Sequence, residues 1–191
     1  MKTVAISSEK IILGIDPGTN ILGFGILSVK QNRMSLLDMG ILQMNKIAGH
    51  ELKLKKIFEC TLELIDKYHP DELAIEAPFF GKNVQSMLKL GRAQGVAMAA
   101  GLYRTVPIFE YSPRKIKQSI TGNGNSSKEQ VAAMLQTILK LPKLPKHFDA
   151  TDAAAAAVCH HFQKNGNGKS FGKNGSWKNF IEKNPERVAT V

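Results

Sequence analysis

The sequence has few cysteines and no long hydrophobic run. Its two cysteines, Cys60 and Cys159, lack the spacing of metal ligands, so we expect reduced, packed thiols rather than a disulfide framework or a zinc site. No apolar run approaches the roughly 20 residues that span a bilayer, and residues 1–10 lack the apolar centre of a secretory signal. We therefore expect a cytoplasmic protein without a membrane segment.

Acidic residues are scarce relative to basic ones. The chain has 16 Asp and Glu against 26 Lys and Arg, a formal net charge of +10. The segment from Gln163 onward carries a net +4 of this, so a net +6 remains on the rest of the 191 residues. An excess of this kind usually serves a polyanionic partner, and nucleic acid is the first candidate. The length fits one domain.

Hydrophobic periodicity predicts an α/β chain. Three strands, at 11–16, 21–29 and 34–44, form an antiparallel meander whose second turn is at residues 31–33. A helix at 51–68 then leads to a buried strand at 71–78. Next come a small-residue helix at 82–103, a strand at 106–111 and a short basic helix from 112. A helix at 126–140, with a Ser126–Glu129 capping box, precedes an alanine-rich helix at 147–163.

Two of the predicted strands end on a single acid. Asp16 closes the first strand before a Pro-Gly-Thr-Asn turn, and Glu76 closes the strand at 71–78. A crossover helix between them favours a parallel pair, so both acids would lie at the same edge of the sheet. Capping of its own turn is the ordinary role for an Asp before Pro-Gly. A buried carboxylate, however, needs a partner or a cation.

A second pair of acids lies at a predicted helix start. Asp149 and Asp152 are three residues apart and share one face of the first turn, where capping is again the ordinary role. Together the four acids would form the oxygen-ligand cluster that Mg²⁺ or Mn²⁺ prefers. Such a site suits hydrolysis of a phosphodiester by two ions, with nearby lysines and arginines holding the other phosphates.

Five ordered blocks of sequence resemble the RuvC-type Holliday-junction resolvases. The blocks begin at Ile12, Leu73, Leu88, Phe109 and Asp149, and the likeness runs from about Ile11 to Gln163. The resemblance implies a ribonuclease-H-like fold, with a central mixed five-stranded sheet and helices on both faces. It also implies a homodimer that nicks two opposing strands of a four-way DNA junction, leaving 5′-phosphate and 3′-hydroxyl ends. The branch-migration proteins RuvA and RuvB are implied as partners.

The same resemblance implies residue roles. Asp16, Glu76, Asp149 and Asp152 would bind the metal, two Mg²⁺ per site with Mn²⁺ as a substitute, and carry out catalysis. Some relatives have His in place of Asp149, which makes His147 a second candidate. The resemblance also implies Lys117 and Lys128 as lysines near the scissile phosphates, and Phe79, or alternatively Phe80, as the aromatic that stacks on a base at the junction centre. Lys82 and Arg114 complete the expected DNA-binding set.

Other roles remain open for several of these residues. From the residues alone, Lys117 and Lys128 are ordinary surface charges, and Phe79 and Phe80 are ordinary core residues. His160 and His161 are expected at the surface or at a dimer contact. The nuclease domain would span residues 1–163, with an extension at 1–10, and residues 164–191 would form a basic, largely flexible tail.

Two rival functions share parts of this pattern. Actin-like and sugar-kinase-like ATPases also have an Asp-x-Gly-Thr loop, but they need a second similar loop, which 191 residues do not provide. A catalytically dead DNA-binding protein of the same fold would lack one or more of the four acids. All four are present, so a metal-dependent nuclease is favoured.

Overall fold

The computed structural model describes residues 9–78, 83–143 and 147–164. Its elements are β1 (Lys10–Asp16), β2 (Ile21–Lys30), β3 (Arg33–Gln43), α1 (His50–Tyr68), β4 (Glu72–Glu76), α2 (Val84–Tyr103), β5 (Ile108–Tyr111), α3 (Pro113–Thr121), α4 (Lys128–Leu139) and α5 (Phe148–Lys164). Every strand and helix predicted from the sequence is present. No helix in the described part of the chain is long and apolar enough to cross a membrane.

The sheet is mixed and five-stranded, with the order β3-β2-β1-β4-β5. β1, β2 and β3 form the antiparallel meander, and β4 and β5 run parallel to β1. Gln31 and Asn32 make the two-residue turn between β2 and β3, both with positive φ, as a primed hairpin turn requires. The predicted sheet type and turn are confirmed.

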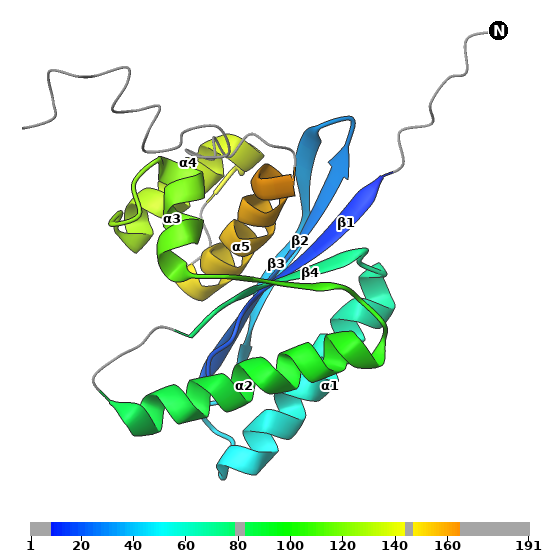
Figure 1. The fold of residues 1–191 in the computed structure, drawn as a ribbon, viewed down its shortest axis with the longest axis vertical. Helices are drawn as coiled ribbons and strands as arrows, with labels where there is room; N and C mark the ends of the chain where they lie inside the picture. The colour runs from blue at the N-terminus through cyan, green and yellow to red at the C-terminus, as the bar shows by residue number, and fades with distance from the viewer. Residues whose placement is uncertain (1–8, 79–82, 144–146, 165–191) are drawn as a thin grey trace, which may run out of the picture.

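Helices cover both faces of the sheet (Figure 1), as predicted. α3, α4 and α5 pack on one face around buried residues such as Ile12, Leu27 and Leu135. α1 and α2 pack on the other around Leu13, Ile26 and Ile57. Alternate residues of β1 thus point into separate cores, which is the two-residue period of a strand.

α5 lies unusually close to β1 and β2, because both contacting surfaces are made of small residues. A Cβ atom added at Gly14 would lie 2.1 Å from the Ala153 carbonyl oxygen, and one at Gly23 would lie 2.0 Å from the Asp149 carbonyl oxygen. The α5 residues facing the sheet are largely alanine, and Ala153 and Ala157 are fully buried. Glycine on the strands is therefore required for the helix to approach this closely.

Two expectations for the α5 side of the fold are wrong. The capping box of α4 is formed by Ser127 and Gln130 rather than Ser126 and Glu129, because the Ser126 hydroxyl is buried against Thr121. His160 and His161 are buried rather than at the surface, because the side of α5 that carries them packs into the fold.

His160 belongs to a polar chain that crosses the interior. Its Nδ1 atom lies 2.6 Å from the Tyr111 hydroxyl, and its Nε2 atom lies 2.5 Å from the Glu72 carboxylate. Glu72 also pairs with Lys10 and Lys164. Burial raises the pKa of Glu72, but these partners outweigh it and hold the pKa at about 2. Lys164 was expected to be the first residue of the tail, but it is the last residue of α5.

Replacement of Gly23 by alanine should destabilise the protein by about 2 kcal/mol or more, because the new methyl group would collide with the α5 backbone. Urea denaturation monitored by circular dichroism measures this loss. Ser35→Ala, at an exposed position of β3, is the control and should change the free energy of unfolding by no more than about 0.5 kcal/mol. Equal stability of Gly23→Ala and the control would contradict the close packing.

Candidate active site

The first two acids lie side by side, as the sequence predicts. Ile15 of β1 pairs with Ile75 of β4 in parallel register, so Asp16 and Glu76, the next residue in each case, end neighbouring strands at the same edge of the sheet. Ile15 and Ile75 are fully buried. The two carboxylates therefore project from the rim of a packed core, which fixes the strands that carry them.

The second pair reaches this edge through the first turn of α5. Asp149 and Asp152 stand within the first five residues of the helix, and the Asp149 backbone lies directly against Gly23 of β2. Gly23 is paired with Asp16 across β1 and β2. The close approach of helix and sheet thus brings the start of α5 to the strand end that carries Asp16.

The acids interact electrostatically, as a clustered set should. Burial raises the pKa of Asp16 to about 7, with further contributions from the charges of Asp152 and Asp149. Burial likewise raises the pKa of Glu76 to about 8, and Asp16 and Asp152 add to the shift. The pKa of Asp152 is raised as well, again chiefly by burial. Burial and mutual repulsion therefore both disfavour the ionised forms of these acids.

Lys128 supplies positive charge beside these acids. It is the first residue of α4, and its Nζ atom lies 2.6 Å from Asp152 Oδ2. Burial lowers the pKa of Lys128, but the bond to Asp152 and the charges of Asp16 and Asp149 raise it overall. Lys117 of α3 acts on the same site, because its charge lowers the pKa of both Glu76 and Asp152.

The donor set is suited to a divalent cation, although the side chains are not arranged around one. In the described ranges no three Asp, Glu, His or Cys side chains form a group that could hold a metal ion as they stand. Asp152 is instead bonded to Lys128. Carboxylate oxygens are the ligands that Mg²⁺ and Mn²⁺ prefer, and a bound cation would offset the burial and repulsion that raise the pKa values of Asp16 and Glu76.

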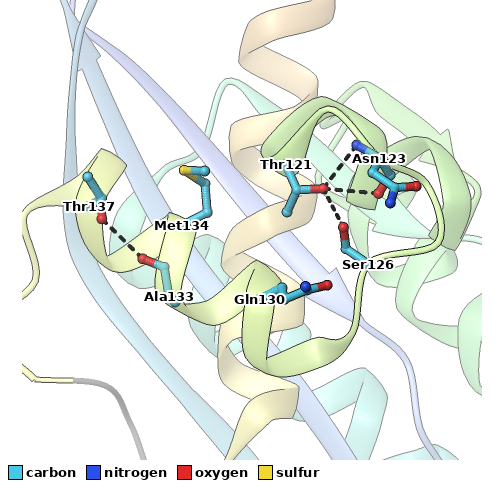
Figure 2. A pocket seen from close by; sticks show the side chains of 7 residues that line it. All are labelled: Thr121, Asn123, Ser126, Gln130, Ala133, Met134 and Thr137. Atoms are coloured by element: carbon cyan, nitrogen blue, oxygen red, sulfur yellow. Dashed lines mark hydrogen bonds between the residues drawn. The ribbon is translucent and has the colours of Figure 1, made fainter.

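The loop between α3, which carries Lys117, and α4, which begins at Lys128, is tied together by side-chain hydrogen bonds (Figure 2). The Thr121 hydroxyl lies 2.8 Å from that of Ser126 and donates to the Asn123 carbonyl oxygen. These residues line a pocket of about 520 Å³ together with Gln130 and Met134. No lining residue is a carboxylate, so this pocket is distinct from the acidic cluster, and the hydroxyl network serves to fix the loop.

Among the described residues, Arg114 and His147 make no hydrogen bond or ion pair with the four carboxylates. Arg114 is exposed in the first turn of α3, where its side chain lies beside Gly124. His147 is also exposed. Phe79, Phe80 and Lys82 lie outside the described residues, as do most of the predicted extension and tail. Sequence reasoning did not find Glu72 as the partner of His160, since nothing in the local pattern distinguishes it from a surface acid.

Solved structures share this architecture. A structure of T. thermophilus RuvC in complex with Holliday junction substrate superposes with a TM-score of 0.77 at 30% identity, covering 83% of this chain and 96% of that one. A second Thermus thermophilus RuvC structure gives a TM-score of 0.74 at 29% identity and covers 82% and 96%. The ribonuclease-H-like fold expected from the sequence is confirmed.

Sequence comparisons point to the same family. The crossover junction endodeoxyribonuclease RuvC of Christiangramia forsetii is 63% identical over 185 residues, 96% of this chain and 95% of that protein. That of Porphyromonas gingivalis is 56% identical over 186 residues, with 94% and 97% covered. The family model for crossover junction endodeoxyribonuclease RuvC, a nuclease family that uses divalent metal ions, matches residues 12–160. The chain therefore belongs to the RuvC family of crossover junction endodeoxyribonucleases.

Proposed function

We propose that Asp16, Glu76, Asp149 and Asp152 form the catalytic site for resolving four-way DNA junctions. The observation that supports this most is the meeting of acids from two strand ends and a helix start at one edge of the sheet, with pKa values raised to about 7 for Asp16 and about 8 for Glu76. The rival function, an actin-like or sugar-kinase-like ATPase, is not supported, because the family model that matches this chain is that of a nuclease.

The four carboxylates would hold two Mg²⁺ ions, with Mn²⁺ as a substitute. Bound ions of this kind activate water and stabilise the leaving oxygen in phosphodiester hydrolysis. Lys117 and Lys128 would hold phosphates near the cut, since both already lie within electrostatic reach of the acids. Phe79, or Phe80, would stack on a base at the junction centre, and Lys82 and Arg114 would contact further phosphates.

Paired nicks in opposing strands require two active sites, and α2 offers a surface for a homodimer. One face of this helix is exposed and apolar, with Val84 63%, Leu88 50% and Leu102 64% exposed. Gly91 and Gly95 lie on the same face with no described atom within 4 Å of an added Cβ. The opposite face, with Ala93 and Ala97, is buried in the fold. We assign the open face to a second copy of the chain.

The cellular setting follows from the substrate. Symmetric nicks that leave 5′-phosphate and 3′-hydroxyl ends can be ligated directly, which serves recombination and DNA repair. RuvA and RuvB, as branch-migration proteins, would present the junction, and the cytoplasm is the compartment that goes with such a DNA substrate. The proposed division is a nuclease domain to about residue 163 followed by a basic tail.

Asp16→Asn should reduce nicking of a synthetic four-way junction in Mg²⁺ by at least about 100-fold, while junction binding remains. The reason is that the amide removes a charged metal ligand without changing the shape of the side chain. Glu63→Gln, at an exposed position on α1, is the matched control and should cut normally. Linear duplex should resist the wild-type enzyme, and rapid nicking by folded Asp16→Asn would refute the catalytic role.

Without metal, the carboxylates should make stability fall as pH rises. Asp16 and Glu76 keep their protons up to about pH 7 and 8 in the folded protein, but lose them near pH 4 when unfolded. Between these pH values the folded state therefore binds more protons than the unfolded state. The stability that the two protonated carboxyl groups contribute is lost as pH rises toward 8. The melting temperature in EDTA measures this, and Mg²⁺ should restore several degrees at pH 8.

Asp16→Asn is the control for this measurement, because it retains every other titrating group. His160 and His161 have pKa values lowered by burial, so below about pH 6.5 they act in the opposite direction in both proteins. The difference between wild type and variant isolates the contribution of Asp16. Parallel melting curves for the two proteins from pH 6 to 8.5 would contradict the pKa shift of Asp16.

Leu88→Glu should convert the dimer into a monomer at micromolar concentration, because two buried charges would face each other across the two-fold axis. Sedimentation velocity measures the change, and paired cutting of opposite strands should fall with it. Leu37→Glu is the control, since Leu37 is equally exposed at 50% but lies on β3. A dimer that survives Leu88→Glu would place the contact elsewhere.

A further inference from the structure

A second polar pocket lies beyond the acidic cluster, where three segments meet. Its volume is about 500 Å³, within the range of ligand sites. The β1–β2 turn contributes Thr19 and Asn20, the first turns of α1 contribute His50 and Lys53, and α2 contributes Ser86 and Lys89. Figure 1 shows α1 and α2 together on the face of the sheet opposite α5, each starting near its lower edge.

The lining of this pocket is positively charged. Lys53 and Lys89 both line it, and no lining residue is a carboxylate. Lys53 donates to the Asn20 side chain at 2.7 Å, which holds its ammonium group at the pocket. Lys89 makes no hydrogen bond or ion pair with any residue that the structure describes. Its charge is therefore available to a ligand.

A buried polar atom in the same pocket also lacks a partner. The Nε2 atom of His50 is shielded from solvent and makes no hydrogen bond within the described residues. Buried polar atoms are normally satisfied, and one left without a bond costs free energy. Because this atom is shielded, a ligand oxygen in the pocket would satisfy it once the imidazole ring turns toward the pocket.

The lysines, rather than the start of α1, would bind an anion here. The helix has Gly49 as its N-cap and no side-chain cap, but the Glu51 carboxylate folds back close to Gly49. That carboxylate already meets the positive end of the helix. Two ammonium groups with hydroxyl and amide donors nearby are a typical arrangement for phosphate.

The pocket is close to the proposed catalytic edge. Thr19 follows Asp16 by three residues, so their Cα atoms are at most about 11 Å apart. Duplex DNA advances about 3.4 Å per nucleotide along its axis, so the near side of the pocket, at Thr19, lies about three nucleotides or fewer from Asp16. A DNA strand whose scissile phosphate lies at the carboxylates can therefore reach the pocket with a neighbouring phosphate.

We propose that this pocket binds a backbone phosphate of the cleaved strand, within about three nucleotides of the cut, through Lys53, Lys89 and His50. The proposal rests on the nuclease function proposed above. It gives the site a contact that is independent of base sequence and fixes the register of the strand on the catalytic edge. A free phosphate ion would satisfy the same groups, so the test must separate the two.

The first test is the salt dependence of junction binding in EDTA. Lys89→Gln should weaken binding of a synthetic four-way junction about 3- to 10-fold and lower the slope of log K against log salt by about 0.9, the value for one phosphate contact. Lys55→Gln is the matched control, because Lys55 is exposed on α1 and paired with Glu59. His50→Phe, which keeps an aromatic ring at the position but removes the ring nitrogens, should also weaken binding.

The second test locates the phosphate. Junctions carrying one neutral methylphosphonate at each of the three positions on either side of the cut should bind the wild type more weakly at one position only. At that position Lys89→Gln should lose no further affinity. Glu51→Gln should bind unmodified junctions slightly more tightly, since it removes the nearest negative charge.

The outcomes separate this inference from the nuclease proposal. Failure of the wild type to bind or nick the junction would count against the nuclease function itself. Normal nicking, with Lys89→Gln and Lys55→Gln equal in affinity and slope, would overturn the phosphate pocket alone. Binding of inorganic phosphate in the pocket, with no methylphosphonate effect at any position of the junction, would show a site for a free anion. That result would also overturn the phosphate pocket proposed for DNA.

Discussion

The close contact between α5 and the glycines of β1 and β2 is the constraint on which the proposed site depends. Gly14 and Gly23 leave no room for a side chain, and the helix presents alanine in return. The helix backbone therefore lies directly on the strands. Only this short separation allows carboxylates on the first turn of a helix to share a site with carboxylates at strand ends.

This closeness has an electrostatic cost. Asp16 and Glu76 are desolvated beside other acids, and their pKa values rise to about 7 and about 8. Lys128 offsets part of the repulsion through its bond to Asp152. The fold thus holds together a set of like charges that would separate if the helix were free to move. If the proposed site binds a metal, a cation that replaces the lysine would couple metal binding to the packing of the helix.

The sequence predicted the parts of the site that follow from regular geometry. A strand, a crossover helix and another strand place Asp16 and Glu76 at one edge, and their acid-ended sequences identify both positions. The three-residue spacing of Asp149 and Asp152 likewise predicted that they share one face of the first turn of a helix. What brings the two pairs together, the contact at Gly23, depends on tertiary packing. A glycine in a strand can equally mark a bulge or a tight bend, so this contact was not predictable from periodicity.

Other features were missed for the same reason. His160 and His161 have no local pattern that separates a buried histidine from an exposed one, since the partner Glu72 is 88 residues away. The capping box of α4 was displaced by one residue because two serines are adjacent and only packing selects Ser127. Likewise, the pocket around Lys53 and Lys89 combines three distant segments, none of which has a recognisable motif of its own.

The polar chain through Tyr111, His160 and Glu72 has a consequence for the position of α5. A helix whose buried face is mostly alanine has a smooth surface. Dispersion forces alone would therefore distinguish poorly between positions of α5 that differ by a shift of one turn along the helix axis. The bonds from His160 to β4 and β5 are directional, so they select one placement. A polar contact at the far end of α5 therefore acts together with the glycine contacts to set the height at which its first turn meets the strand ends.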